Sequence, residues 1–287
     1  MDKTKDNIAV SSLYTAGAWR WGRLPCADFV TPDGAQAVFR IVNLYMRFYR
    51  LVNPQVYSLK HQLLHRHAAI DSLLRLSPSA RVIEVACGFS PRGSHVSASP
   101  QIEYIEIDLP EVVVRKRQQL ESTPAGRVVL ARPNFHLQPG DITTLDFAEE
   151  FGVHKSTAVV TEGLMMYFPR DVQMRIWRSI AFLLRKTGGL YLFDYIPLSD
   201  EPPRSTVGEW LHRFGQKVLK LTSDFAYDGR TRSDVAQDLA DAGFADVKAI
   251  DTGTVAREWG LPQSSVPTRT IIYCCRAESR RANAGRA

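Results

Sequence analysis

The chain has 287 residues, 45% hydrophobic and 23% charged, so it can bury a sizeable core as one large α/β domain or two small ones. The net charge is +6, but half of it lies in residues 276–287, which carry four arginines and one glutamate. The small charge left on the rest of the chain argues against a nucleic-acid partner. The sequence has neither an apolar run of about 18 residues nor the apolar segment of a secretory signal, so it predicts a cytoplasmic protein without membrane contact.

The cysteines carry no metal or disulfide pattern. Cys26, Cys87, Cys274 and Cys275 form no CxxC pair, which favours free thiols in a reducing compartment. Cys274 and Cys275 are adjacent in a strand-like run, so their side chains should point to opposite faces of a sheet.

Residues 1–76 have a helical pattern and no clear strand. The segments 34–52 and 57–76 space their apolar residues three and four apart, and Pro54 separates them. This pattern predicts a helical N-terminal cap over residues 1–76.

From Arg81 onward, alternating apolar runs replace the helical pattern. Strand-like and helical segments take turns along the chain, which predicts a parallel sheet covered on both faces. Strands are expected in residues 81–87, 102–109, 134–141, 156–163 and 189–196, and helices in residues 110–123, 143–152 and 169–189.

The rest of the chain completes the sheet. After residue 200, the pattern predicts an inserted helix at 204–221, a helix at 231–244 and strands at 245–252 and 268–277. The expected fold is a doubly wound, Rossmann-like α/β domain whose seven-stranded sheet is mostly parallel with an antiparallel last strand. This core spans residues 77–275 with a helical insertion at about 200–230, and a disordered basic tail follows at 276–287.

The first strand-to-helix turn and the tip of the second strand predict a nucleoside ligand. Ligands of open parallel sheets bind outside the carboxyl ends of the strands, and Asp108 follows Gly88 by 20 residues, as an acid that binds ribose would. The turn, "ACGFSPRG", lacks the GxGxxG fingerprint of dinucleotide enzymes, and the chain has no P-loop. A ribose acid without a pyrophosphate loop favours S-adenosylmethionine.

Several motifs together resemble the leucine carboxyl methyltransferase family, nearest to its bacterial O-methyltransferases of polyketide and other natural-product pathways. The resemblance covers roughly residues 10–275. It is carried by "VIEVACGFSPRG", "YIEIDLPEVVVRKR", "QPGDI" and "VVTEGLMMYFPRDVQ", with "YTAGAWRWGRLPCADFVTP" and "LLHRHAAIDSLL" before them.

The resemblance implies a class I methyltransferase and a set of residues that bind the cofactor. In this set, Glu84 and the Cys87–Gly88 turn border the methionine end, Arg66 and Arg92 pair with the carboxylate, Asp108 holds the ribose with Leu109 against the adenine, Asp141 and Ile142 contact the adenine amino group and ring, and Glu162 lines the amino or ribose side. The chain departs from the family at Ser90, where members often have an aspartate, and at Ala86, where glycine is common.

Each of these assignments has a structural alternative. Asp108 and Asp141 could each cap the helix that follows. Glu162 could form a structural salt bridge, and Arg66 could be a solvated arginine on a helix surface.

The acceptor is expected to be a small molecule, free or carrier-bound. A carboxylic acid is already ionised at neutral pH, whereas a phenol with a pKa near 10 favours a positioned base. No base is assigned among the matched motifs, so carboxylate methylation is preferred. Methylation of a phenol or enol, and a methyltransferase-like fold used for other chemistry or for binding, are the alternatives.

An aromatic wall after Glu162 is the candidate acceptor pocket, although its members could equally be core residues. The candidates are Tyr167, Tyr195, Trp210 and Tyr227, with Met165, Met166 and Phe214 beside them, and Arg204, Arg213 or Arg230 to pair with an acceptor carboxylate. His61 and His65 are spaced as a metal pair would be, but no third ligand is spaced to join them, so no metal is expected.

Overall fold

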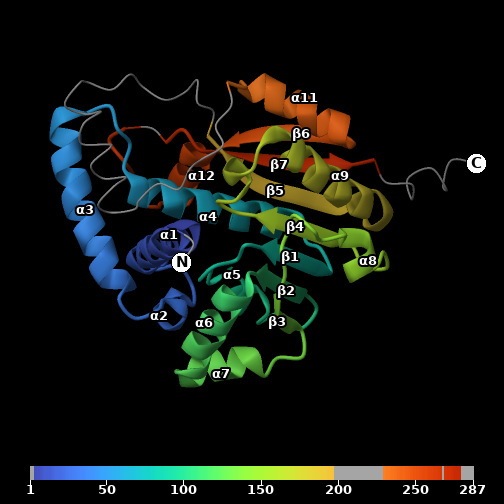
Figure 1. The fold of residues 1–287 in the computed structure, drawn as a ribbon, viewed down its shortest axis with the longest axis horizontal. Helices are drawn as coiled ribbons and strands as arrows, with labels where there is room; N and C mark the ends of the chain where they lie inside the picture. The colour runs from blue at the N-terminus through green and yellow to red at the C-terminus, as the bar shows by residue number, and fades with distance from the viewer. Residues whose placement is uncertain (1–2, 197–228, 267, 279–287) are drawn as a thin grey trace, which may run out of the picture.

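The computed structural model describes residues 3–196, 229–266 and 268–278, with side chains from residue 10 onward. Its centre is a seven-stranded sheet in the order β3-β2-β1-β4-β5-β7-β6 (Figure 1). The strands are β1 (Arg81–Val85), β2 (Glu103–Asp108), β3 (Phe135–Pro139), β4 (Thr157–Thr161), β5 (Gly189–Tyr195), β6 (Phe244–Asp251) and β7 (Ile271–Ala277). β7 pairs antiparallel with both β5 and β6, while the first five strands pair in parallel, so the expected fold class is confirmed.

Helices cover both faces of the sheet. They are α1 (Lys3–Trp21), α2 (Ala27–Val30), α3 (Ala35–Val52), α4 (Leu59–Leu76), α5 (Arg92–Val96), α6 (Pro110–Glu121), α7 (Pro124–Leu130), α8 (Phe147–Phe151), the 3-10 helix η1 (Met165–Tyr167), α9 (Arg170–Thr187), α11 (Arg232–Ala242) and α12 (Thr252–Glu258). The inserted helix expected at 204–221 and most of the expected tail lie outside the described residues.

The helix expected over residues 143–152 is shorter in the structure. α8 begins at Phe147, because the Asp146 carboxylate accepts hydrogen bonds from the backbone N–H groups of Ala148 and Glu149. Residues before Asp146 form a turn closed by Asp141 instead. Capping chemistry, which the apolar spacing does not report, sets this boundary.

Two hydrophobic clusters lie on opposite faces of the sheet. Val82, Leu190 and Cys274 pack with residues of the N-terminal helices on one face. Ile83 and Cys275 pack with α9 and α11 on the other. Alternation along the strands produces this division, and it places Cys274 and Cys275 on opposite faces as the sequence predicts.

The N-terminal helices share the core of the sheet. Ala16 of α1, Ala35 of α3 and Ile70 of α4 belong to the same buried cluster as the strands.

β5 and β6 end opposite the start of β7, which defines the edge of the sheet where the parallel strands have their carboxyl ends. Figure 1 shows α1 and α3 beyond this edge.

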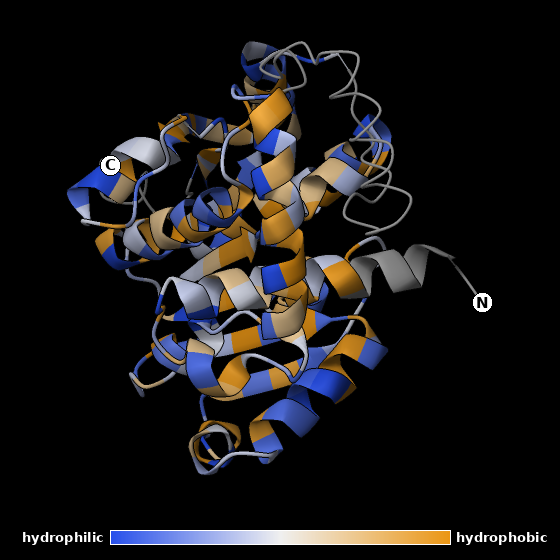
Figure 2. Cartoon of the chain, turned by 90° about the vertical axis from the view of Figure 1, so that its left-hand side faces the viewer, coloured by the Kyte–Doolittle hydropathy of each residue, from blue (hydrophilic) through white to orange (hydrophobic). Residues whose placement is uncertain are grey.

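α3 has an outward apolar face as well as a buried one. Figure 2 views the molecule from the side of α3 and shows hydrophobic residues along it. Ile41, Leu44, Phe48 and Leu51 are between 57% and 75% exposed. Even so, no helix among the described residues combines the length and the apolar character needed to cross a bilayer.

Candidate functional site

Buried acids line one face of the sheet near its carboxyl-end edge. Glu84 of β1 lies in register with Glu106 of β2, and Asp108 and Asp194 extend the set on β2 and β5. All four are at most 9% exposed. Strand alternation puts Glu84, Glu106 and Asp194 on the face that α4, α5 and α6 cover, so adjacent like charges there require cations from these helices.

Arg92 at the start of α5 is the centre of the resulting network. Its Nε donates to Asp71 Oδ1 at 2.5 Å, its Nη1 donates to Glu84, and its Nη2 donates to Glu162 Oε2 at 2.7 Å. Arg92 is 1% exposed. Burial opposes its charge, but the Glu84, Asp71 and Glu162 carboxylates outweigh this effect and raise its pKa well above the usual value.

Arg66 of α4 connects the network to β5. Its Nε donates to Glu162 Oε1 at 2.9 Å and its Nη1 donates to Asp194 Oδ2 at 3.0 Å, while Asp194 Oδ1 accepts from the Gly163 N–H. His67 Nδ1 lies 2.9 Å from Glu162 Oε2. Burial opposes the negative charge of Glu162, but His67, Arg66 and Arg92 outweigh it and hold its pKa well below the usual range.

A second buried ion pair, between Lys116 and Glu106, contacts the turn that follows β1. Lys116 Nζ of α6 lies 2.7 Å from Glu106 Oε2 and donates to the Ser90 carbonyl at 2.9 Å. Both side chains have no exposed surface. Burial raises the pKa of Glu106 to about 7 against the opposing charge of Lys116. Gly93 is required here, because a Cβ at that position would collide with the Glu106 carboxylate.

Asp108 faces the first turn, as a ligand-binding acid would. Its Oδ2 accepts from the Gly88 N–H at 2.7 Å and its Oδ1 accepts from the Leu109 N–H at 2.8 Å. α6 is preceded by Leu109 and has no side-chain cap, so the carboxylate does not serve as its N-cap. Burial raises the pKa of Asp108, and the two N–H donors oppose this shift.

The turn has left-handed backbone at Ala86 (φ +57°) and Gly88 (φ +50°). Ala86 replaces the glycine that is common in the resembled family, at a position where glycine would carry no steric cost. Cys87 between them is 3% exposed, and burial raises its pKa well above the usual value.

The "PGDI" segment lies beside Asp108. The Gly140 N–H donates to the Asp108 carbonyl at 2.9 Å, so the ends of β2 and β3 are held together. Asp141 is exposed and accepts from the Thr143 N–H and hydroxyl at 2.9 and 2.8 Å, which closes a turn and does not cap a helix. Ile142 is buried. Leu109 is half-buried at the same end of β2.

The predicted acceptor residues are only partly brought together. Tyr195 is 3% exposed on the α9 face of the sheet, with its ring centroid 6.4 Å from that of Tyr273, and Met165 is fully buried in the same cluster. Tyr167 is half-buried in η1. Arg230 pairs with Asp238 at 2.6 Å. Arg204, Trp210, Arg213, Phe214 and Tyr227 lie outside the described residues.

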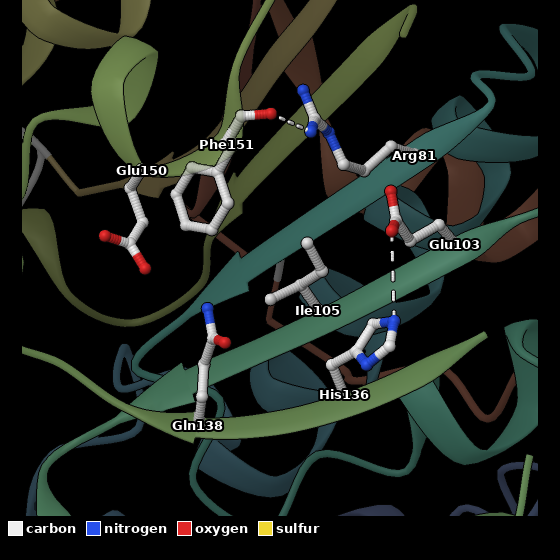
Figure 3. A pocket seen from close by; sticks show the side chains of 7 residues that line it. All are labelled: Arg81, Glu103, Ile105, His136, Gln138, Glu150 and Phe151. Atoms are coloured by element: carbon white, nitrogen blue, oxygen red, sulfur yellow. Dashed lines mark hydrogen bonds and ion pairs between the residues drawn. The ribbon is translucent and has the colours of Figure 1, made fainter. Parts of the chain in front are cut away.

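A hollow of about 260 Å³ lies on the same sheet face as α8 and away from this network (Figure 3). Arg81 and Glu103 at the amino ends of their strands line it, with Ile105 between them. It contains none of the predicted site residues. Among the described residues, no three His, Cys, Asp or Glu side chains gather as a metal site would require.

Sequence reasoning missed part of the network. The missed residues are Asp71, Tyr104, Glu106, Lys116 and Asp194. Glu106 and Asp194 are charged residues inside apolar strand runs, and Lys116 falls on the stripe that Val113 and Leu120 bury. A charge on a predicted apolar face was the available signal.

Part of the chain is similar in sequence to a known protein, and the fold is similar to solved structures. The tetracenomycin polyketide synthesis O-methyltransferase TcmP of Streptomyces glaucescens is 28% identical over 124 residues, which span 43% of this chain and 42% of that protein. The aligned part is thus less than half the length of that relative.

Two solved structures have the same fold at low identity. Human N-acetylserotonin methyltransferase in complex with S-adenosylmethionine superposes with a TM-score of 0.51 at 16% identity, covering 93% of this chain and 66% of that one. A protein from Bordetella parapertussis superposes with a TM-score of 0.53 at 15% identity, covering 97% and 98%.

The model of the family described as leucine carboxyl methyltransferase matches residues 27–181, more than half of this chain. The match contains β1, the turn at Gly88, Asp108 and Glu162, the residues on which the site is built. The chain therefore belongs to the leucine carboxyl methyltransferase family, and its cofactor is S-adenosylmethionine.

Proposed function

We propose that this methyltransferase is an O-methyltransferase that esterifies a carboxylate of a small, natural-product-like molecule, free or carrier-bound. The observation that carries the proposal is the environment of His67. This imidazole lies in the network but is 1% exposed and held 2.9 Å from Glu162, so it does not face an acceptor as a base. Among the described residues, the site thus offers no free base, and an ionised carboxylate requires none.

The residues present fit the cofactor. A Cβ at Gly88 would have no atom within 4 Å, so the turn borders open space next to Asp108. Asp108 lies where a ribose diol would be accepted, at the tip of β2. Arg66 is 7% exposed and Arg92 is 1% exposed, so Arg66 is the better placed to meet the cofactor carboxylate.

The charge balance also favours a cationic ligand. Six carboxylates face three side-chain cations in and beside the network, not counting His67. The carboxylates are Asp71, Glu84, Glu106, Asp108, Glu162 and Asp194, and the cations are Arg66, Arg92 and Lys116.

When bound, S-adenosylmethionine supplies a methyl group on a positively charged sulfur. The chain contributes orientation: Asp108 fixes the ribose, and Arg66 with Glu162 fixes the methionine end. Holding the reactants about 3 Å apart and in line provides most of the rate acceleration such a transfer needs.

The four cysteines are unpaired, which supports the cytoplasmic location as part of this proposal.

Calorimetry with S-adenosylmethionine tests the cofactor site. Asp108→Asn removes one charged acceptor, and hydrogen bonds to charged groups contribute about 1.5–3 kcal/mol, so Kd should rise about tenfold to a hundredfold. Asp146→Asn is the matched control, because asparagine caps α8 equally well and lies outside the site. Equal affinity of Asp108→Asn and the parent protein would contradict the assignment.

The acceptor class is tested with radiolabelled cofactor and a panel of aromatic carboxylic acids and phenols. A methyl ester releases labelled methanol in mild base, whereas an aryl methyl ether survives the same treatment. Label released from a carboxylic-acid product supports the proposal. A base-stable product formed only from phenols would replace it with the phenol alternative, which the likeness to TcmP, a polyketide O-methyltransferase, keeps open.

A further inference from the structure

A separate group of basic side chains lies where α3 ends and α4 begins, next to the loop that precedes β7. We call Arg50, Lys60, His61, His65 and Arg269 the cap basic cluster. His65 Nε2 lies 2.8 Å from the Pro262 carbonyl. Arg269, two residues before β7, lies over the ring of Tyr57 just before α4, with 5.8 Å between its Cζ and the ring centroid. The cluster therefore sits at the carboxyl-end edge of the sheet, on the side of β7.

The cluster has aromatic neighbours and no acidic partner at its centre. Lys60 Nζ lies 4.1 Å from the centroid of Trp21, whose ring also meets His61 edge-on at 5.2 Å. Within the part of the chain described, neither Arg50 nor Lys60 has a carboxylate within salt-bridge distance. Arg50 Nη2 donates only to the Ser265 hydroxyl, at 3.0 Å.

Buried polar atoms in the cluster lack hydrogen-bond partners. Among the described residues, Arg50 Nε, His61 Nδ1 and Arg269 Nη1 are each buried without one. His65 Nδ1 is also unpartnered, but it is an acceptor in the neutral ring, because Nε2 donates to the Pro262 carbonyl. His65 as a whole is only 2% exposed. Buried polar atoms are nearly always satisfied in folded proteins, so the unpartnered N–H donors of Arg50 and Arg269 indicate a missing acceptor.

The N-terminus of α4 adds to the positive potential. Within the part of the chain that the structure describes, its N-cap residue, Ser58, makes no side-chain capping bond, and the N–H groups of a first helical turn have no partner within the helix itself. Lys60 and His61 lie in that first turn. The aligned peptide dipoles of an 18-residue helix favour an anion at this end.

Burial and the neighbouring positive charges both lower the pKa values of Lys60 and His61. Burial, followed by Arg50, lowers the pKa of Lys60. Burial, followed by Lys60, His65 and Arg50, lowers the pKa of His61 to about 4. Among the described residues, the negative charge of Asp251 raises the pKa of His65 against the effect of burial. A bound anion would oppose the repulsion and raise the pKa of His61.

We propose that the cap basic cluster binds an oxyanion of the acceptor, a carboxylate or phosphate group other than the one that is methylated. Arg66 follows Lys60 by six residues on α4, about 9 Å along the helix axis. An acceptor held at one end by the cluster can thus place its other end near Arg66 and Glu162. This inference rests on the proposed function for the identity of the ligand, and it makes the acceptor a molecule with a second acidic group.

The test follows the ring signals of His61 by NMR across pH 3–8, with inorganic phosphate or benzoate as the probe. Either probe should raise the pKa of His61 by at least one unit. Arg50→Gln should weaken the response at least fivefold, while Arg47→Gln, an exposed arginine on the same helix, should leave it unchanged. No shift of His61 with either probe, or equal responses of both variants, would overturn the proposal.

The two probes distinguish the sources of the oxyanion. A stronger response to phosphate assigns the site to a phosphorylated carrier arm, and a stronger response to benzoate assigns it to an acceptor carboxylate. The titration is run without S-adenosylmethionine and repeated with it. A response of His61 without cofactor binding would refute only the proposed function, and cofactor binding without a response would refute only this inference.

Discussion

At the scale of single residues, the buried Lys116–Glu106 pair is the clearest case of charges that must be kept together. Neither side chain has exposed surface, and Lys116 also holds the Ser90 carbonyl of the first turn. Removing one member leaves the other as an uncompensated buried charge, whereas replacing both with apolar residues removes the problem.

We expect Lys116→Met to lower the free energy of unfolding by about 3–5 kcal/mol, because Glu106 is left unpaired. The double variant Lys116→Met with Glu106→Leu should recover most of that loss. Lys155→Met is the control, since its pair with Glu103 is exposed and such pairs contribute about 0–1 kcal/mol. Urea unfolding measures all three, and a double variant no better than the single one would contradict the expectation.

The residues of the first turn show which parts of the site can be predicted from local sequence and which cannot. The 20-residue separation of Gly88 and Asp108 predicts an acid at the tip of the second strand that binds ribose. The structure adds a hydrogen bond of 2.7 Å from the Gly88 N–H to Asp108 Oδ2. The sequence did not predict that Glu162 lies between Arg66 and Arg92, because those residues come from different elements far apart in the chain.

At the scale of elements, α3 has two apolar faces, and its sequence does not say which one is buried. Phe39, Val42 and Tyr49 face inward, whereas Leu44 and Phe48 face outward. Periodicity predicted the helix with nearly its observed bounds. Packing against α1, which only the fold provides, selected the face.

Two substitutions on α3, one on each apolar face, test which face is buried in the folded protein. Phe39→Ala should lower the free energy of unfolding by about 3–5 kcal/mol, because it leaves a cavity between α1 and α3. Leu44→Gln, on the 57% exposed side, should change it by less than about 0.5 kcal/mol. Chemical denaturation measures both, and a large loss for Leu44→Gln would show that this face is covered in solution.

At the scale of the whole molecule, the N-terminal helices and the sheet share one core. Ala16 and Ala35 pack in the same cluster as Val82 and Leu190. We therefore expect residues 1–76 to unfold together with the sheet, in one cooperative transition.

Tryptophan fluorescence tests this cooperativity, because Trp19 lies in α1 and Trp177 lies in α9 on the other side of the sheet. Two single-tryptophan variants, which retain Trp19 or Trp177 and replace the other four tryptophans with phenylalanine, should report the same urea midpoint. That midpoint should also match far-ultraviolet circular dichroism. An earlier midpoint for Trp19 would mean that the cap is an independent unit.

The sequence by itself determined the seven-stranded α/β fold and placed Gly88 and Asp108 at the ends of its first two strands, because strand alternation, helix spacing and the strand-to-helix turn are local properties of the chain. Only the tertiary structure decided the partners of Glu162 and the gathering of Arg50, His61 and Arg269 at one edge. Those contacts join residues that are distant in sequence, and the charges and unpaired donors that give them meaning exist only once the elements have packed.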